Sequence, residues 1–312
     1  MRRIVPLLSL LCAGSGCILL DAPPVSVERA RLLAANTDFE QVAAGAQAAC
    51  ASSTGGVTAC FGDDTDDLGV IDVPDVEFVR VAGSSDTQAL FCGISVKDQL
   101  RCWGRLRGAA NPVQYTPLEN PGWVDVTVGA QHACALDESG EVTCWGDNEA
   151  FQREVPNQEF ATIEAAADHT CGTTTQGTVI CWGGGQALPT FLEAIDGQSA
   201  WAVAVGEDFA CRGKLNGANS TYECHLDLAD GVWDTPAIGY VSHAEAGSSH
   251  VCVLARGEIL CFDANERADA EVAEAGEDWA AVSVGREGAC GVTGSGRVVC
   301  WGDLLSPEDA GY

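Results

Sequence analysis

The stretch QHACALDESGEVTCWG (residues 131–146) decides the fold. It holds two cysteines ten residues apart, Cys134 and Cys144, with Trp-Gly directly after the second. If these cysteines face each other on antiparallel strands, a three-residue loop remains at 138–140. The last position of such a loop adopts the left-handed backbone region, where glycine costs least, and Gly140 stands there. The stretch therefore predicts a β-hairpin with its cysteines within disulfide-bridging distance.

This hairpin pattern recurs seven times at intervals of 37 to 42 residues. Leaving out Cys12 and Cys17, the other 14 cysteines form pairs with a spacing of 9, 10 or 13 residues. The pairs are Cys50 with Cys60, Cys92 with Cys102, Cys134 with Cys144, Cys171 with Cys181, Cys211 with Cys224, Cys252 with Cys261, and Cys290 with Cys300. Aromatic residues recur at the same interval. One precedes each cysteine pair, and in six units another directly follows the second cysteine. A fixed period of this length is typical of repeat architectures.

The even spread of the pairs indicates which role the cysteines have. A zinc site needs four clustered ligands, usually from CxxC pairs, and the sequence contains no CxxC. A redox-active dithiol would be one unusual pair, whereas this pattern occurs in all seven units. We therefore expect seven structural disulfides, each stabilising the fold by about 2–3 kcal/mol through restriction of the unfolded chain.

The turn positions support the same register in other units. The slot of Gly140 is filled in four other units by Gly56, Asp98, Gly177 and Gly296. Each of these residue types tolerates a positive φ. The sixth unit has a cysteine spacing of nine, which predicts a two-residue turn at 256–257. The fifth unit has the longest spacing, 13, and we expect it to have the most protruding hairpin.

Another strand precedes each hairpin. WVDVTVG (123–129) alternates three valines on one face with Asp125 and Thr127 on the other, which is the period of a β-strand. Seven four-stranded units of about 40 residues predict an all-β fold, a seven-bladed β-propeller over residues 38–312, with one disulfide per blade. We expect a strand from residues 24–36 to complete the last blade.

The first residues have the pattern of an export signal. MRR gives a basic start, IVPLLSLLCA an apolar run too short to span a bilayer, and GSGC ends in Cys17. AGSGC resembles a bacterial lipobox, which implies removal of residues 1–16 and lipidation of Cys17, although Gly14 replaces the usual Leu. Signal-peptide cleavage without lipidation is the alternative. We expect residues 17–37 to be a lipidated N-terminus and linker, and the protein to reach the outer membrane or cell surface, with the periplasm as the alternative. Export would place the cysteines in an oxidising compartment.

The unit GAQHACALDESGEVTCWGDN (129–148) resembles the repeats of the regulator of chromosome condensation family. Those repeats have glycine and histidine before a strand and then a Gly-x-Val-x-x-Trp-Gly hairpin. The resemblance implies a seven-bladed propeller, and exported bacterial members with paired cysteines are the most similar. Family members that exchange guanine nucleotides on a nuclear GTPase work inside cells, so that activity is not expected of an exported chain. The family includes a secreted inhibitor of β-lactamases, which implies that the scaffold can bind proteins.

The charge of the chain restricts its partners. Acidic residues outnumber basic ones 45 to 16, a formal net charge of -29. Such a chain repels phosphate backbones and anionic lipid head groups, so we expect no nucleic-acid partner and membrane contact only through the lipid anchor. The same charge favours solubility, and we expect a monomer.

Three groups of polar residues are candidates for a ligand site. His132, His169 and His250 each stand two residues before a first cysteine, and this repeated slot favours packing or a strand-end hydrogen bond over a metal site. DDTDD (63–67) lacks the full spacing of a calcium loop and is interpreted as a solvated acidic turn, with a weak Ca²⁺ site as the alternative. The sequon at Asn219 indicates an exposed loop.

The sequence contains no common catalytic motif, neither HExxH, GxSxG, GxxxxGK[ST] nor GxGxxG. We therefore expect a non-catalytic propeller that needs no cofactor and binds a protein partner through the loops of one face. The alternative is a surface hydrolase or lyase acting on polysaccharide, using loop carboxylates and calcium. Carboxylates with raised pKa values in a cleft at the axis would favour the enzyme, and exposed aromatics on one face would favour the binding protein.

Overall fold

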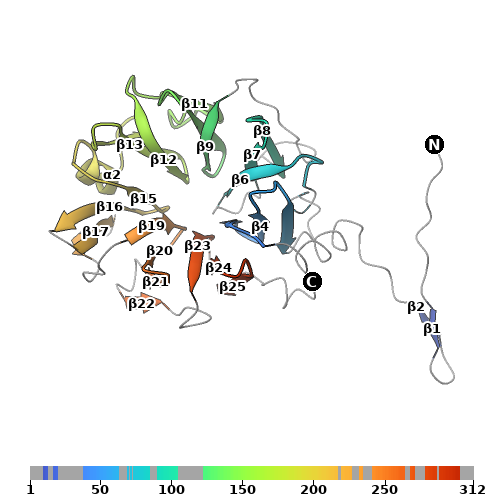
Figure 1. Ribbon diagram of the computed structural model, residues 1–312. Helices are drawn as coiled ribbons and strands as arrows, with labels where there is room; N and C mark the ends of the chain where they lie inside the picture. Colours follow the sequence, from blue (N-terminus) through green and yellow to red (C-terminus); the bar gives the residue numbers. More distant parts are fainter. Residues whose placement is uncertain are drawn as a thin grey trace.

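The computed structural model shows a ring of small antiparallel sheets around a central axis (Figure 1). It describes residues 10–12, 17–19, 38–62, 69, 71, 73–84, 90–104, 122–216, 219–226, 232–234, 241–263, 268–270, 278–286 and 288–302. The seven sheets of the ring are the blades of a propeller, so the expected all-β, seven-bladed fold is confirmed. Among the described residues, no helix is long and apolar enough to cross a membrane.

Each blade starts with a strand beside the axis and continues outward through the hairpin that carries the cysteines. Blades 1 to 3 are β3(Gln41–Ala44), β4(Ala48–Ser52), β5(Thr58–Gly62); β6(Phe78–Gly83), β7(Leu90–Ser95), β8(Leu100–Gly104); and β9(Trp123–Val128), β10(His132–Asp137), β11(Val142–Gly146). Blades 4 and 5 are β12(Phe160–Ala166), β13(His169–Thr174), β14(Val179–Gly183), α2(Thr190–Ile195); and β15(Val203–Val205), β16(Phe209–Asn216), β17(Asn219–Leu226), β18(Val232–Asp234). Blades 6 and 7 are β19(Val241–Ala246), β20(His250–Ala255), β21(Glu258–Asp263), β22(Ala268–Ala270); and β23(Trp279–Val284), β24(Gly288–Thr293), β25(Val298–Gly302).

The predicted cysteine pairs are all present as disulfides, one in each blade. In every blade the two cysteines lie directly opposite each other on the second and third strands of the sheet. From blade 1 to blade 7, the bonds join Cys50 to Cys60, Cys92 to Cys102, Cys134 to Cys144, Cys171 to Cys181, Cys211 to Cys224, Cys252 to Cys261, and Cys290 to Cys300. The pairing read from the spacing therefore holds in the long hairpin of blade 5 and the short one of blade 6 as well as in the others.

The hairpin of blade 3 has the turn predicted from the sequence. The Asp137 N–H donates to the Glu141 carbonyl at 3.0 Å, which closes the three-residue loop. Gly140 has φ +87°, as the loop requires.

The other turns also follow the prediction. The slot of Gly140 has a positive φ in four further blades, at Gly56, Asp98, Gly177 and Gly296. In blade 6, Arg256 and Gly257 have φ +58° and +78°. Two positive φ values in succession are those of a type I′ hairpin turn. The hairpin of blade 5 is the longest in the described part of the chain, with two strands of eight residues.

The expectation of a fourth strand is met in blades 5 and 6 but is wrong for blades 3 and 4. In blade 3, residues 147–159 form turns held by side-chain hydrogen bonds. In blade 4 the short helix α2 replaces the strand and buries Phe191, Leu192 and Ile195. The chain after the third strand of blades 1, 2 and 7 lies largely outside the described residues.

The disulfides and the repeated aromatics meet at the junctions between blades. In one buried cluster, Cys50 and Cys60 of blade 1 pack with Phe78 and Trp103 of blade 2. The same arrangement recurs at the junctions of blades 2 and 3, 3 and 4, 6 and 7, and 7 and 1. Each of these disulfides therefore closes its own hairpin and also packs against the aromatic side chains of the next blade. This explains why aromatics and cysteines share one period in the sequence.

The junction between blades 4 and 5 departs from this arrangement. The residue after the second cysteine of blade 5 is His225, whose ring is smaller than the Trp or Phe side chains at this position in the other blades. Here Cys171 and Cys181 of blade 4 pack in one cluster with Phe191 and Leu192 of α2 and with β15. The helix therefore supplies the apolar side chains that the fifth repeat lacks.

The ring closes where blade 7 meets blade 1. The Phe39 N–H donates to the Gly296 carbonyl at 3.1 Å, and the Ala44 N–H donates to the Ser283 hydroxyl at 2.9 Å. Ahead of blade 1, β1(Leu10–Cys12) and β2(Cys17–Leu19) form a separate antiparallel pair. The predicted closing strand at 24–36 lies outside the described residues. The domain boundaries and the lipidation of Cys17 remain predictions.

Candidate functional site: the axial pocket and the first-turn face

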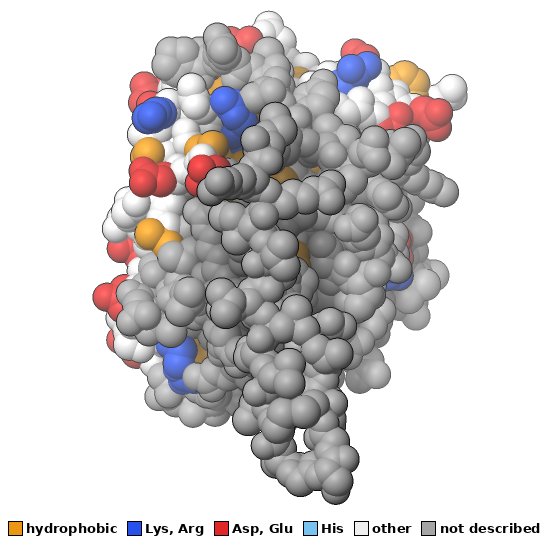
Figure 2. Space-filling view, turned by 90° about the vertical axis from the view of Figure 1, so that its right-hand side faces the viewer, with side chains coloured by type: hydrophobic (Ala, Val, Ile, Leu, Met, Phe, Trp, Pro, Cys, Tyr) orange, Lys and Arg blue, Asp and Glu red, His pale blue; other side chains and the backbone are white. Residues whose placement is uncertain are grey.

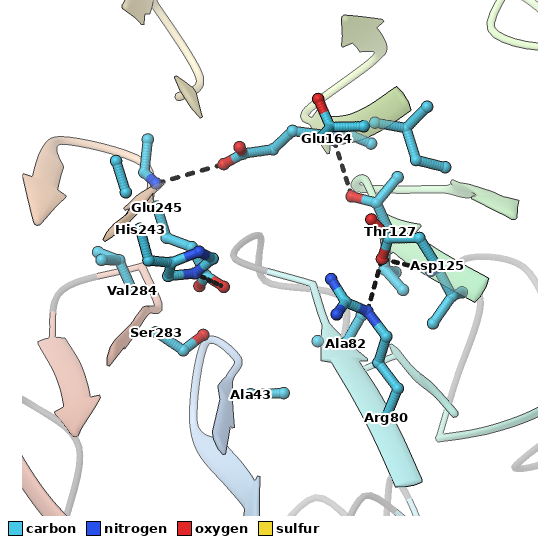
Figure 3. Close-up of a pocket in the computed structure, with 18 of the residues that line it drawn as sticks. Ala43, Arg80, Ala82, Asp125, Thr127, Glu164, His243, Glu245, Ser283 and Val284 are labelled. Atoms are coloured by element: carbon cyan, nitrogen blue, oxygen red, sulfur yellow. Dashed lines mark hydrogen bonds and ion pairs between the residues drawn. The ribbon is translucent and has the colours of Figure 1, made fainter. Parts of the chain in front are cut away.

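A pocket lies on the propeller axis, lined by the first strands of the blades. Its volume is about 340 Å³. The slot opposite the first cysteine holds, from blade 1 to blade 7, Ala43, Ala82, Thr127, Glu164, Ala204, Glu245 and Ser283. Side chains one pleat earlier, among them Arg80, Asp125 and His243, also line the pocket (Figure 3). The seven strands thus bring side chains of both charges to one place.

Arg80 and Asp125 form an ion pair between blades 2 and 3. The Arg80 Nε lies 2.6 Å from Asp125 Oδ1, which also accepts the Val126 N–H at 2.7 Å. Burial raises the pKa of Asp125, and the Arg80 guanidinium opposes part of that rise. The carboxylate is therefore already committed to a cation and to a backbone donor.

Glu164 extends from β12 across the pocket toward blade 6 (Figure 3). Its carboxyl accepts the Ala246 N–H at 3.4 Å and also a hydrogen bond from the Val205 N–H of blade 5. Burial, followed by repulsion from Glu245, raises the pKa of Glu164 well above its ordinary value. Glu245 itself lies 3.0 Å from the Nε2 of His243, and although burial lowers the pKa of His243, this carboxylate raises it more.

The axial slot has a structural function that recurs between blades. The Thr127 hydroxyl accepts the Ala165 N–H of the next blade at 2.8 Å, and Ser283 does the same for Ala44. Glu164 follows the same rule with Val205, and its longer side chain also reaches Ala246, two blades away. Blade 5 has Ala204 in the slot, which offers no side-chain acceptor to blade 6. Glu164 therefore accepts the Ala246 N–H of blade 6 in place of Ala204, which has no side-chain acceptor.

The repeated geometry also explains two of the histidines, which point from one blade to the next. The Nε2 of His132 lies 2.8 Å from the Thr170 hydroxyl, and that of His169 lies 3.0 Å from the Gly206 carbonyl. Both rings are buried, and burial lowers the pKa of each to about 4. The interpretation as packing and strand-end hydrogen bonding is confirmed for these two residues.

The third histidine and the remaining candidates give no metal cluster. His250 is half-buried, with its Nε2 3.3 Å from an Asp263 oxygen and its Nδ1 2.8 Å from the Ser249 hydroxyl. In the described ranges, no group of three or more His, Cys, Asp or Glu side chains is placed to hold a metal ion. DDTDD lies outside the described residues, and Asn219 closes the long hairpin of blade 5 opposite Asn216.

Exposed apolar side chains lie near both faces of the ring. We call the face formed by the turns between first and second strands the first-turn face, and the opposite one the hairpin face. Within the described residues, the exposed large hydrophobic side chains are Val96 and Val124 near the hairpin face and Phe151 on the first-turn face. In the side view of Figure 2, acidic, basic and small apolar areas alternate over the described surface.

Sequence reasoning missed the axial residues and Phe151. The alternating pattern of 123–129 places Asp125 on the polar face of a strand, but the approach of Asp125 to Arg80 depends on how separate strands meet at the axis. The one available signal was the variation of the axial slot among Ala, Thr, Ser and Glu while its neighbours repeat. Phe151 gave no signal because it lies outside the repeated positions.

Taken together, the chain is a seven-bladed β-propeller with one disulfide in each blade. Residues 123–152, which span most of blade 3, match the family profile described as regulator of chromosome condensation (RCC1) repeat. The other units repeat the cysteine spacing and the aromatic positions of this one, so the ring is built from copies of the unit that matches this profile. No curated protein sequence matches it.

Solved structures support the fold. The ectodomain of the Physcomitrella patens receptor kinase CR4 is similar with TM-score 0.64 and 20% identity over 84% of this chain and 72% of that one. The CRINKLY WD40 ectodomain of Arabidopsis thaliana ACR4 gives TM-score 0.63 and 19% identity over 86% and 96%. Saccharomyces cerevisiae Prp20p, described with its binding to Gsp1p and histones, gives TM-score 0.62 and 15% identity over 86% and 83%.

Proposed function

We propose that this chain is an exported, non-catalytic propeller that binds a protein partner through the loops of one face. The observation that carries the proposal is the state of the axial pocket. Asp125 is paired with Arg80, Glu245 with His243, and Glu164 with backbone N–H groups of two other blades. The contacts of Asp125 and Glu164 join blades, and that of Glu245 lies within β19, so each of the three carboxyl groups already has a partner. This leaves the loops that differ between blades as the surface for recognition.

Similar structures favour the same role. One structure shows yeast RCC1 (Prp20) bound to Kap60, and Prp20p is described as binding Gsp1p and histones. The propeller scaffold therefore serves protein recognition in proteins of this fold, and we extend that role to this chain by analogy.

Export is supported by chemistry and by analogy. Seven disulfides are typical of a protein in an oxidising compartment, and two of the similar structures are receptor ectodomains. The N-terminal apolar run and the lipobox-like AGSGC supply a route out of the cell and an anchor at Cys17. We propose that the lipidated chain stands on the outer membrane or the cell surface.

Affinity capture from the envelope of the native organism tests the binding function. The bait is the exported propeller, and its disulfide-reduced form is the matched control because it has the same charge without the fold. We expect one partner that is identified by mass spectrometry and rebinds as a purified protein with 1:1 stoichiometry. Recovery of the same proteins by the reduced control, or failure of every recovered protein to rebind, would contradict the proposal.

Replacing Cys17 tests the anchor. Cys17→Ala should abolish incorporation of labelled palmitate and release the protein from the membrane fraction, with the fold unchanged by circular dichroism. Labelled palmitate in the Cys17→Ala protein would refute lipidation at this residue.

A second candidate function rests on one observation. Asp125 and Glu164 are carboxyl groups with raised pKa values in one pocket. In polysaccharide cleavage, a protonated carboxyl group can act as the general acid and an ionised one as the general base. Release of reducing or unsaturated ends from envelope polysaccharide by the wild type, and its loss in Glu164→Gln, would establish this alternative. Equal background release by both proteins would exclude the pair as its catalytic groups.

A further inference from the structure

The loop that follows β11 holds an aromatic side chain in an unfavourable backbone conformation. Phe151 has φ +65°, and 41% of its surface is exposed. The left-handed region is unfavourable for a residue with a Cβ, and an exposed phenyl ring recovers little of that cost by burial. Glycine or asparagine would fill this position with less strain. The fold of the blade therefore gives no reason for a phenylalanine here.

The loop is fixed to the next blade by a fully buried side chain. The Gln152 amide oxygen accepts the Ala150 N–H at 2.9 Å, and its amide nitrogen donates to Asp168 at 3.3 Å. The Gln152 carbonyl accepts the Trp182 indole N–H at 3.0 Å. Phe151 thus stands beside a residue that is anchored on both its backbone and its side chain.

A second side chain fixes the other half of the loop. Asn148 accepts the Arg153 N–H at 2.8 Å through its side-chain oxygen and donates to Glu154 at 3.2 Å. Its carbonyl accepts the Phe151 N–H at 3.2 Å. The loop is therefore ordered before any partner arrives, which removes much of the entropic cost of placing an aromatic anchor at an interface.

The surroundings of Phe151 are acidic. Four carboxylates lie on or beside the loop, at Asp147, Glu149, Glu154 and Asp168, against the single guanidinium of Arg153. The whole chain has a formal net charge of -29. A partner surface with basic side chains is therefore attracted to this face, and one of like charge is repelled.

We propose that Phe151 is the apolar anchor of a docking surface on the first-turn face, formed by loop 147–154 and the Asp168 turn, for a basic protein partner. The partner surface presents an apolar socket for the phenyl ring, with Lys or Arg side chains around it. This inference deepens the proposed protein-binding function and rests on it. Aromatic anchors in a polar rim are the usual energetic centres of protein interfaces.

Selection of binding peptides tests the surface without knowledge of the natural partner. Random 12-residue peptides displayed on phage are selected on the intact exported protein, and the enriched sequences are synthesised. We expect sequences that combine aliphatic or aromatic residues with Lys or Arg. Phe151→Gly should weaken their binding at least tenfold, because hot-spot residues contribute more than about 1.4 kcal/mol. Raising NaCl from 50 to 300 mM should weaken binding further, because salt screens the acidic rim.

The choice of variants separates binding from folding. Glycine suits φ +65°, so Phe151→Gly should melt at the wild-type temperature or above while losing the peptides. Val124→Ser removes an equally exposed apolar side chain from β9 near the hairpin face and should leave peptide binding unchanged. Peptides that bind wild type and Phe151→Gly equally would overturn this docking surface but leave the protein-binding function standing. A selection in which no peptide is enriched would also overturn the surface, while the envelope capture decides the function by itself.

Discussion

Within a blade and between blades, this propeller is held together in two different ways. Inside each blade the same hairpin is closed seven times by the same covalent bond. Between blades the residue in the axial slot changes: the Thr127 hydroxyl joins blades 3 and 4, the Ser283 hydroxyl joins blades 7 and 1, and the Glu164 carboxyl reaches from blade 4 to blade 6. The difference shows that repetition in this chain secures each unit, whereas the order of the units around the ring depends on residues that do not repeat.

Reduction should have the largest effect, because it removes the repeated bond from every blade. Loss of a native disulfide costs about 2–5 kcal/mol, and neighbouring losses need not add. Replacing Cys134 and Cys144 together by Ser should lower the free energy of unfolding by that amount in denaturant titrations. Intact mass of the mature exported protein should rise by 14 hydrogens on reduction, because seven disulfides open. Free thiols before reduction would contradict the disulfide assignment.

Acid should weaken the junctions next. His132 and His169 have pKa values of about 4 in the fold, against 6.5 for a free histidine. Below pH 6.5 the unfolded chain binds protons that the folded chain refuses, so stability falls as pH drops from 6.5 to 4. The contribution is on the order of 3 kcal/mol for each histidine. The double variant His132→Gln, His169→Gln should show a flatter acid limb in the pH dependence of unfolding. An unchanged limb would show that the rings are protonated in the fold.

The hydroxyl of Thr127 should have a smaller effect. Thr127→Val keeps the shape of the side chain but leaves the buried Ala165 N–H without its acceptor, which costs about 1–2 kcal/mol. Thr127→Ser retains the hydroxyl and serves as the matched control. Denaturant unfolding should rank the proteins wild type, Ser, Val. If Val is as stable as wild type, the axial slot has no part in joining blades 3 and 4.

Replacing Glu164 should have the smallest effect on stability, and at high pH the replacement should stabilise the protein. Burial and then Glu245 raise its pKa, so the folded chain keeps this proton to higher pH than the unfolded chain does. Stability from this group is therefore lost as pH rises through the raised pKa. Glu164→Gln cannot ionise and should melt roughly 2–4 °C above wild type at pH 8, with little difference at pH 5. A lower melting temperature for the variant at both pH values would show that the carboxylate is required in its charged form.

The features predicted from the sequence are those fixed by local geometry. The spacing of Cys134 and Cys144, the left-handed Gly140 and the type I′ turn at Arg256 each depend on residues close together in the chain. Such constraints repeat wherever the hairpin repeats, so seven weak signals support one another. The fold class and the disulfide pairs follow from them.

The features that were not predicted depend on contacts between distant segments. The helix α2 replaces a strand because Phe191 and Leu192 fill a junction where the fifth repeat has His225 instead of a large aromatic, and that exchange is visible only once blades 4 and 5 are packed. The approach of Arg80 to Asp125 requires the axis, which no single repeat contains. Phe151 owes its conformation to Gln152 and Asn148, which are specific to one loop.

The reach of Glu164 over blade 5 has a consequence for how the ring unfolds. In a repeat protein whose units contact only their immediate neighbours, the cost of opening one unit depends on that unit and on its two adjoining interfaces. A bond from blade 4 to blade 6 couples three consecutive units, so that opening the middle one also strains the link between its neighbours. Native-state hydrogen exchange should therefore find the amides of blades 4 to 6 exchanging together as one cooperative unit. Ala204→Ser adds to blade 5 a hydroxyl acceptor for the Ala246 N–H. In that variant the amides of blade 6 should exchange independently of those of blade 4.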